Sequence, residues 1–206
     1  MPRRYAAVLF DLLTGLIDSW TLWNRVAGSE ENGRRWRAEY LKLTYGCGEY
    51  QPYESLVRVA ATRARLPESL ATRLHDGWDA LEPWDDARGV LERLAKDYRL
   101  GVVTNCSQRL GCAAAKRLGV EFDVIVTAER AGYYKPHPKP YQLALHELNL
   151  RPEGVLFVAG SAFDLVGTAA VGLDTYWHNR VGLERPGQAP APRREARTLK
   201  ELFAES

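Results

Sequence analysis

A short apolar run that ends on a carboxylate, at residues 6–11, constrains the fold of this chain more than any other feature. The run Ala-Ala-Val-Leu-Phe has no polar residue before Asp11, which is typical of a strand buried on both faces of a parallel sheet. Ligands of open α/β sheets bind just beyond the carboxyl ends of the strands. Asp11 is therefore a candidate nucleophile or metal ligand. The alternative is an Asp that only turns or caps the chain after a strand.

Strands and helices alternate along the chain after Pro83. Apolar runs of strand length are separated by segments in which apolar residues recur every three or four positions. The pattern predicts strands over 100–104, 122–127, 155–159 and 175–178, the last strand of the chain, and helices over 85–96, 108–118, 138–148 and 162–171. This alternation is typical of a parallel sheet with helices on both faces, so we predict a Rossmann-like α/β core.

A purely helical stretch separates the first strand from the rest. From Ser19 to Leu81 apolar residues recur at helical spacing, and Ser19 and Pro67 are suited to helix starts. We predict about four helices that form a cap over the strand ends. On this interpretation residues 1–17 and 83–206 form the core and residues 18–82 form the cap.

The composition narrows the setting in which the protein works. The 206 residues suffice for one α/β core with a small inserted domain, and 28 basic against 26 acidic residues give a net charge of only +2. Such a balance does not indicate nucleic acid or an anionic membrane as a partner. The three cysteines lack disulfide or zinc spacing, the N-terminal stretch resembles a buried strand rather than a signal peptide, and no apolar run approaches the roughly 20 residues of a membrane span. We expect a soluble cytoplasmic protein whose segment 185–193 is an exposed loop.

Polar side chains follow four of the predicted strands. They are Asp11 after the first, Thr104 and Asn105 after the second, Lys135 after the third, and Ser161 and Asp164 after the fourth. Each has a purely structural explanation. Thr104 and Ser161 are suitable helix caps, Asp164 is a suitable first-turn acid, and a lysine is usually solvated. Because the carboxyl ends of parallel strands meet at one edge, we expect the six side chains to share a crevice.

These motifs, taken in order, resemble the haloacid dehalogenase superfamily, and within it the L-2-haloacid dehalogenases. The resemblance rests on FDLLTGL at 10–16, VVTNCS at 102–107, YKPHPKPY at 134–141 and FVAGSAFD at 157–164. Two further matches point to the dehalogenase branch. Arg37 lies in the cap where that branch carries a halide-binding arginine, and Tyr141 follows Lys135 by six residues, as in that branch.

The resemblance implies a covalent mechanism. Asp11 displaces halide from C2 of a 2-haloacid and forms an ester, which water activated by Asp164 then hydrolyses to a 2-hydroxy acid. Lys135 holds Asp11 ionised. The resemblance assigns the remaining residues to substrate and halide binding: Arg37 to the halide, Thr104 and Asn105 to the substrate carboxylate, Ser161 to the water, and Leu13, Tyr141 and Phe163 to the pocket wall.

Two absences separate this chain from the phosphatases of the superfamily. Those enzymes have a second Asp two residues after the nucleophile, where this chain has Leu13. They also have a magnesium-binding acid directly after the glycine of the fourth motif, where this chain has Ser161. A departing halide needs no proton, so a dehalogenase does not need the acid that Leu13 replaces. A magnesium site needs oxygen ligands, and Ser161 replaces one of them. We therefore expect no metal and no cofactor, with a 2-haloacid and halide as the small-molecule partners and a possible homodimer.

The chain also departs from the dehalogenase pattern. Leu13 replaces an aromatic residue, Thr14 and Gly15 stand in reversed order, and Ala159 and Ser161 replace a serine and an asparagine. Arg37 can instead belong to a solvated helix face, with Arg34 or Arg35 in its role. Two other functions remain open at this point. One is a magnesium-dependent phosphatase, and the other is a non-catalytic protein that binds a small acid.

Overall fold

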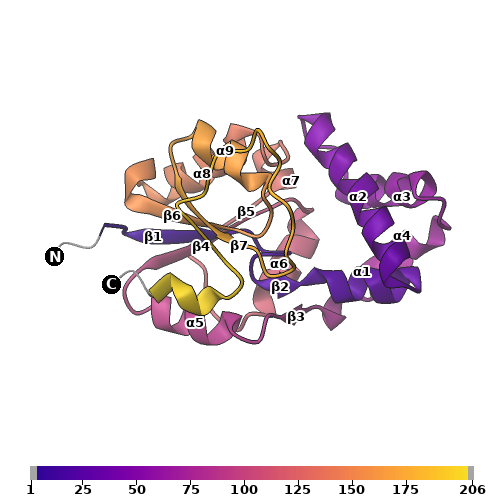
Figure 1. Ribbon diagram of the computed structural model, residues 1–206, viewed down its shortest axis with the longest axis horizontal. Helices are drawn as coiled ribbons and strands as arrows, with labels where there is room; N and C mark the ends of the chain where they lie inside the picture. The colour runs from indigo at the N-terminus through magenta and orange to yellow at the C-terminus, as the bar shows by residue number, and fades with distance from the viewer. Residues whose placement is uncertain (1–3, 204–206) are drawn as a thin grey trace.

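The apolar run forms β1 (Ala7–Phe10), the strand from which the sheet extends in both directions in the computed structural model, which describes residues 4–203. The sheet has six parallel strands in the order β5-β4-β1-β6-β7-β8, and Figure 1 shows it between helices. The other strands are β4 (Arg99–Thr104), β5 (Val124–Thr127), β6 (Val155–Ala159), β7 (Asp174–His178) and β8 (Arg194–Ala196). The Rossmann-like α/β core is confirmed.

Alternation of side chains along β1 divides the core into two layers. Val8 and Phe10 pack in one cluster with residues of α5 (Ala87–Leu94) and α6 (Gln108–Lys116). Ala7 and Leu9 pack in a second cluster with residues of α8 (Pro138–Leu148) and α9 (Asp164–Ala170). Each fully buried side chain of the size of Leu9 or Phe10 contributes roughly 1.5–3 kcal/mol. Burial on both faces explains why this strand has no polar residue.

The order of the strands places the end of β1 at a switch point of the sheet. The chain passes from β1 to β4 on one side, and β6 later pairs with β1 on the other side. The backbone N–H of Asp11 still donates to the Val158 carbonyl of β6, at 2.9 Å. Ligands of such sheets bind in the crevice at this point, so the fold presents Asp11 at its preferred ligand position.

The helices between β2 and β3 gather at the end of the molecule that the strands point toward, and we refer to them as the cap (Figure 1). They are α1 (Ser19–Ala27), α2 (Glu30–Cys47), α3 (Tyr53–Arg63), α4 (Ser69–Asp76) and η1 (Trp78–Ala80). Aromatic rings hold them together. The Trp23 ring lies 4.7 Å from Trp36 and 5.5 Å from Tyr40, whose ring lies 5.5 Å from Tyr53. The chain leaves and re-enters the core through an antiparallel pair, β2 (Ile17–Asp18) with β3 (Glu82–Pro83).

This pair lies at the two predicted boundaries, 17/18 and 82/83. The division into core and cap stays a prediction, and residues 1–3 and 204–206 of the predicted core lie outside the described residues. Within the described part of the chain, no helix has both the length and the apolar character needed to cross a membrane.

Several predicted elements are confirmed to the residue, and others needed correction. α8, β6 and the start of α1 at Ser19 match the prediction. Pro67 does not begin a helix, because α4 starts at Ser69. The strand predicted over 175–178 is not the last one, because β8 pairs with β7 beyond it. β8 has only three residues, two of them charged, which suits the edge of a sheet but gives no apolar run to recognise. The remaining short elements are α7 (Ala128–Ala131), η2 (Pro152–Gly154) and η3 (Leu199–Phe203).

Candidate active site

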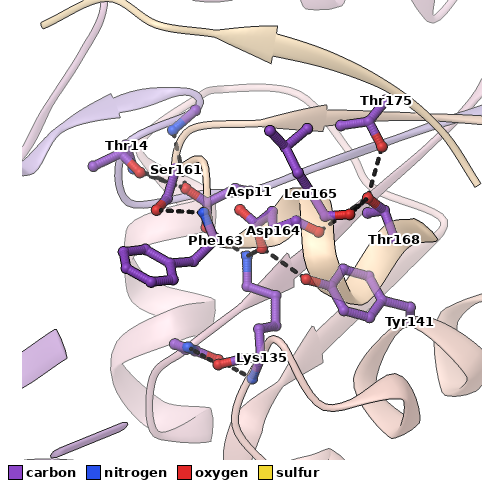
Figure 2. Close-up of polar contacts among 12 residues, drawn as sticks. Asp11, Thr14, Lys135, Tyr141, Ser161, Phe163, Asp164, Leu165, Thr168 and Thr175 are labelled. Carbon is purple, nitrogen blue, oxygen red and sulfur yellow. Dashed lines mark hydrogen bonds and ion pairs between the residues drawn. The ribbon is translucent and has the colours of Figure 1, made fainter. Parts of the chain in front are cut away.

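Asp11 lies in a turn that surrounds its carboxylate with hydrogen-bond donors (Figure 2). Its Oδ2 accepts from the Thr14 hydroxyl at 2.6 Å and from the backbone N–H groups of Thr14 and Gly15, each at 3.2 Å. Its Oδ1 accepts from the Lys135 ammonium at 2.8 Å. The residue is only 7% exposed. A buried carboxylate with this many donors, two of them strong, is stabilised in its ionised form.

Two glycines make room for this turn. A Cβ at Gly15 would lie 2.3 Å from the Asp11 carbonyl oxygen, and a Cβ at Gly160 would lie 2.3 Å from the Gly15 nitrogen and 2.4 Å from the Thr14 hydroxyl. Neither position therefore has room for a side chain. Gly160, which directly follows β6, brings the fourth motif against the back of the turn that holds Asp11.

A Gly160→Ala substitution is expected to lower both stability and activity. The added methyl group must displace the turn at Thr14 and Gly15, and overpacking of this kind costs roughly 1–3 kcal/mol. Chemical denaturation measures the first effect and steady-state kinetics the second. Gly89→Ala is the matched control, because Gly89 lies within α5 with no atom near the place that an added methyl group would take, and helix propensity favours Ala there by about 0.5–1 kcal/mol. Equal stability of the two variants would contradict this account of the turn.

Lys135 joins two buried carboxylates. Its Nζ lies 2.8 Å from Asp11 Oδ1 and 2.9 Å from Asp164 Oδ1, and the residue is 3% exposed. Asp164 Oδ1 also accepts from the Tyr141 hydroxyl at 2.8 Å (Figure 2). Asn105 supports the lysine from behind, since its side chain accepts from the Lys135 N–H at 2.7 Å and donates to the Lys135 carbonyl at 3.0 Å. The segments that follow β1 and β6 thus meet at one ammonium group, and Asn105, which follows β4, holds the backbone of the same lysine.

The three charged groups differ in pKa. Burial by itself raises the pKa of Asp11, but Lys135 and the donors of Thr14 and Gly15 outweigh it and hold that pKa below its ordinary value. Burial raises the pKa of Asp164, and the charge of Asp11 adds to the rise against the opposing effect of Lys135. Burial lowers the pKa of Lys135, but the two carboxylates outweigh it and the pKa is raised. Asp11 is therefore the ionised carboxylate and Asp164 the more basic one, an arrangement that separates a nucleophile from a base.

Arg37 is a buried cation that no carboxylate neutralises within ion-pair distance among residues 4–203. Its Nη1 donates to the Ser19 hydroxyl at 2.8 Å, and Ser19 donates in turn to the Leu13 carbonyl. Its guanidinium lies 4.2 Å from the centre of the Trp20 ring, and its Nε has no hydrogen-bond partner in the described part of the chain. Burial lowers the pKa of Arg37, yet a guanidinium stays charged in proteins. Its surroundings favour a small anion beside it.

Arg34 and Arg35 do not share this position. Arg34 pairs with Glu30 at 2.6 Å on the exposed face of α2, and Arg35 donates to the Ala64 carbonyl at 2.9 Å within the cap. Arg37 alone of the three lines the cavity that contains Asp11. The choice among the three arginines, open from the sequence, is decided by which side of α2 faces the core.

The cavity measures about 60 Å³ and lies between the strand ends and the cap. All but two of the predicted site residues line it: Asp11, Leu13, Arg37, Thr104, Asn105, Lys135, Ser161 and Asp164. Tyr141 lies behind Asp164 rather than at the cavity wall. Phe163 is 40% exposed and packs on Tyr45, with ring centres 4.3 Å apart. The buried Thr104 hydroxyl has no hydrogen-bond partner within residues 4–203, so it is available to a ligand in the cavity.

Several lining residues had not been predicted. They are Thr14, Trp20, Tyr40, Leu41, Tyr45, Gly160 and Leu183. A signal for two of them existed in the sequence. Leu41 and Tyr45 follow Arg37 by four and eight residues, and this spacing places all three on one face of a helix. Leu183 had no such signal, because it lies in a loop after β7.

Comparison with known proteins agrees with this geometry. Residues 8–178 match the family model of haloacid dehalogenase-like hydrolases. Haloacetate dehalogenase H-2 of Moraxella sp. strain B is 30% identical over 168 residues, which cover 76% of this chain and 75% of that protein. (S)-2-haloacid dehalogenase 1 of Pseudomonas sp. strain CBS-3 is 30% identical over 186 residues, covering 84% and 82%. A crystal structure of a dehalogenase superposes with a TM-score of 0.87 at 27% identity, covering 99% of this chain and 98% of that one.

The family match spans the first strand, the helical cap and the core through β7, and the relatives share most of their length with this chain. The chain belongs to the family of haloacid dehalogenase-like hydrolases.

Proposed function

We propose that the protein hydrolyses the carbon–halogen bond of (S)-2-haloalkanoic acids through an ester on Asp11. One observation carries the proposal. A small cavity holds a buried, ionised carboxylate at one side and, at another, a buried guanidinium that has no carboxylate partner among the described residues. A displacement that releases a halide needs this pair of charges, a nucleophile and a site for the departing anion. The dehalogenases among the relatives support the same reaction class.

The first step makes the ester. A carboxylate oxygen of Asp11 attacks C2 of the substrate, the new C–O bond forms as the carbon–halogen bond breaks, and the bonding electrons leave with the halide. Arg37 receives the halide, and no proton moves. The Thr104 hydroxyl, which makes no hydrogen bond within residues 4–203, provides a donor for the substrate carboxylate. Asn105 contributes by holding the backbone of Lys135, whose charge keeps Asp11 ionised.

The second step restores the enzyme. Asp164 takes a proton from a water molecule as that water attacks the ester carbonyl carbon of Asp11. The acyl C–O bond then breaks, so the 2-hydroxy acid leaves with an oxygen from Asp11 and with the proton from Asp164. The water oxygen remains in the regenerated carboxyl group, which loses its proton to solvent. The raised pKa of Asp164 makes it the better base of the two carboxylates.

None of these steps requires a metal ion. The Lys135 ammonium already lies between the two carboxylates, at 2.8 and 2.9 Å, where a divalent cation would need them. The positions that carry the leaving-group acid and a further metal ligand in phosphatases are Leu13 and Ser161. A hard cation such as magnesium needs several oxygen ligands, and this donor set favours the ammonium instead.

Halide release from (S)-2-chloropropionate and bromoacetate, measured with a chelator present, tests the proposal. Release that continues without metal supports dehalogenation. Cleavage of p-nitrophenyl phosphate that depends on added magnesium, without halide release, would identify a phosphatase instead. Binding of these acids without turnover would identify a small-acid-binding protein.

The setting of the enzyme is part of the same proposal. Free cysteines at 47, 106 and 112 suit the reducing cytoplasm, and the resemblance to the dehalogenases favours a homodimer. Sedimentation equilibrium tests the second point, with a mass twice that of the 23.2 kDa chain as the expected result.

As the pH is lowered, the steady-state rate is expected to decline at a higher pH than the rate of ester formation does. The pKa of Asp164 is raised, so this base becomes protonated at a higher pH than an ordinary Asp, whereas the lowered pKa of Asp11 keeps the nucleophile ionised. As the pH falls, a burst of halide equal to the enzyme concentration should remain while the steady-state rate declines. Rapid-quench kinetics across the pH range measure both phases.

Asp164→Asn is the control for this prediction. The variant should show the burst at neutral pH and a steady-state rate lower by about 10²–10⁴-fold, the usual contribution of a general base. Parallel loss of burst and steady-state rate in the wild-type protein would show that Asp11, not Asp164, titrates.

A further inference from the structure

Tyr45 forms a wall of the cavity that none of the proposed steps uses. It lies on α2 eight residues after Arg37 and four after Leu41, on the face of the helix that looks onto the strand ends. The residue is half-buried, and burial raises the pKa of its hydroxyl, with the charge of Asp164 adding to the rise. It therefore stays a neutral phenol beside the reacting groups.

Contacts with the core hold the Tyr45 side chain in place. Its hydroxyl lies 3.3 Å from the Ser161 hydroxyl, and Ser161 also accepts from the Phe163 N–H at 3.3 Å. Its ring packs against the Phe163 ring, with centres 4.3 Å apart. A side chain of the cap is thus held by two residues of the fourth motif, and it lines the cavity on the side of α2.

The charged and polar walls of the cavity are already assigned. Asp11, Lys135 and Asp164 form the reacting side, Arg37 the halide side and the Thr104 hydroxyl the carboxylate side. The walls that remain for a substituent on C2 are apolar or aromatic: Leu13, Trp20, Tyr40, Leu41, Tyr45 and Leu183. Two of them are tied to the core by their hydroxyl groups: Tyr40 donates to the Asn105 carbonyl at 2.9 Å, and the Tyr45 hydroxyl lies 3.3 Å from that of Ser161. Tyr45 also packs on Phe163, the residue before Asp164, so its ring is fixed next to the reacting groups.

The size of the cavity limits what fits beneath this wall. One water needs about 10–15 Å³ of this kind of volume, so the cavity of about 60 Å³ has room for roughly four to six waters. A haloacetate or a 2-halopropionate fits in a cavity of this volume. A butyl chain on C2 that extends toward α2 would displace the Tyr45 ring, with loss of both its hydroxyl contact and its packing on Phe163.

We propose that Tyr45 limits the length of the substituent on C2 and restricts this enzyme to 2-haloacids with hydrogen or a methyl group at that carbon. The proposal rests on the proposed function and adds a substrate class to it. Tyr45 acts by position and takes no part in bond making.

The test compares substrates of different length within each variant. We would measure kcat/KM of the wild-type protein, Tyr45→Ala and Tyr45→Trp for three substrates: bromoacetate, 2-bromopropionate and 2-bromohexanoate. The propionate ratio and the hexanoate ratio are the values for the two longer acids, each divided by the value for bromoacetate. Tyr133→Ala is the matched control, because Tyr133 also joins cap to core, through its hydrogen bond to Glu49 at 3.2 Å, but does not line the cavity. A ratio within one variant is insensitive to a general loss of stability.

The Tyr45→Ala variant should raise the hexanoate ratio at least about tenfold, since pockets discriminate by about 10–200-fold per methylene. The Tyr45→Trp variant should lower the propionate ratio, and Tyr133→Ala should leave both unchanged. If Tyr45→Ala does not fold, the propionate ratio of the Tyr45→Trp variant tests the proposal by itself. A hexanoate ratio near one in the wild-type protein, or ratios that Tyr45 variants do not shift, would overturn the inference.

A failure of the proposed function would look different. The wild-type protein would then release no halide from any of the acids. In that case calorimetric titration with acetate, propionate and hexanoate tests Tyr45 by itself. Hexanoate binding that Tyr45→Ala strengthens at least about tenfold relative to acetate supports the length limit, and an unchanged ratio of dissociation constants contradicts it.

Discussion

The Asp11→Asn variant is expected to keep its fold and to release halide at least about 10³-fold more slowly than the wild-type protein, as removal of a catalytic nucleophile does in other enzymes. An amide has nearly the shape of the carboxylate and can still accept from Thr14 and Gly15. It carries no negative charge, however, and is a poor nucleophile at carbon. Lys135 keeps Asp164 as its ion-pair partner, so the cation is not left alone.

Halide release and isotope labelling measure this prediction together. In a single turnover in ¹⁸O-labelled water, the wild-type protein should gain the label in the peptide that contains Asp11, because water attacks the carbonyl carbon of the ester. Asp79→Asn is the matched control, an exposed acid of η1 outside the cavity lining, and should behave like the wild-type protein. Label found only in the 2-hydroxy acid would mean direct attack of water on C2 and would exclude the ester.

The Lys135→Met variant is expected to lose both activity and stability. Removal of the ammonium leaves two buried carboxylates with no cation between them, and breaking a buried ion pair in this way costs roughly 3–5 kcal/mol. The same change raises the pKa of Asp11 toward that of a buried acid, so less of the nucleophile is ionised. Urea unfolding and halide release measure the two losses.

The stability loss should depend on pH in a defined direction. In the wild-type protein the lowered pKa of Asp11 contributes stability that is present above the ordinary pKa of Asp and is lost as the pH falls through the lowered value. In the variant both carboxyl groups have raised pKa values, so protonation at acidic pH relieves their repulsion. The difference in unfolding free energy between the two proteins should therefore shrink as the pH falls.

Lys116→Met provides the comparison, because Lys116 is an exposed residue at the end of α6 whose loss should change stability by no more than about 0.5 kcal/mol. A Lys135→Met protein as stable as this control at neutral pH would mean that one of the two carboxylates is protonated in the wild-type protein. Because Asp164 has the raised pKa, it would be the protonated group, and its assignment as the base would then fail.

Local sequence patterns sufficed for the core of the fold. β1 and β6 are continuous apolar runs, and α8 begins with prolines and ends at an Asn, so each element carries its own boundaries. Parallel strands bring their carboxyl ends to one edge, and for that reason the sequence alone predicts Asp11, Lys135 and Asp164 in one crevice. The absence of acidic side chains at Leu13 and Ser161 is likewise evident from the sequence.

The contacts between the cap and the core could be identified only from the tertiary structure. Whether Arg34, Arg35 or Arg37 reaches the cavity depends on how α2 is rotated over the strand ends, and three neighbouring arginines have the same local pattern. Asn105 lines the cavity, and its side chain also holds the Lys135 backbone, a contact across thirty positions that no local pattern indicates.

Tyr45 shows the same limit. Its helical spacing from Arg37 indicates a shared face, but its contact with Ser161 joins residues separated by 116 positions. Periodicity reports which residues of one element face the same way, and the parallel sheet adds a rule for where strand ends meet. No comparable rule relates an inserted helix to the sheet beneath it, because that orientation follows from packing of the whole cap. The catalytic groups at the strand ends could therefore be predicted from the sequence, whereas the shape of the cavity depends on how the cap packs on the sheet.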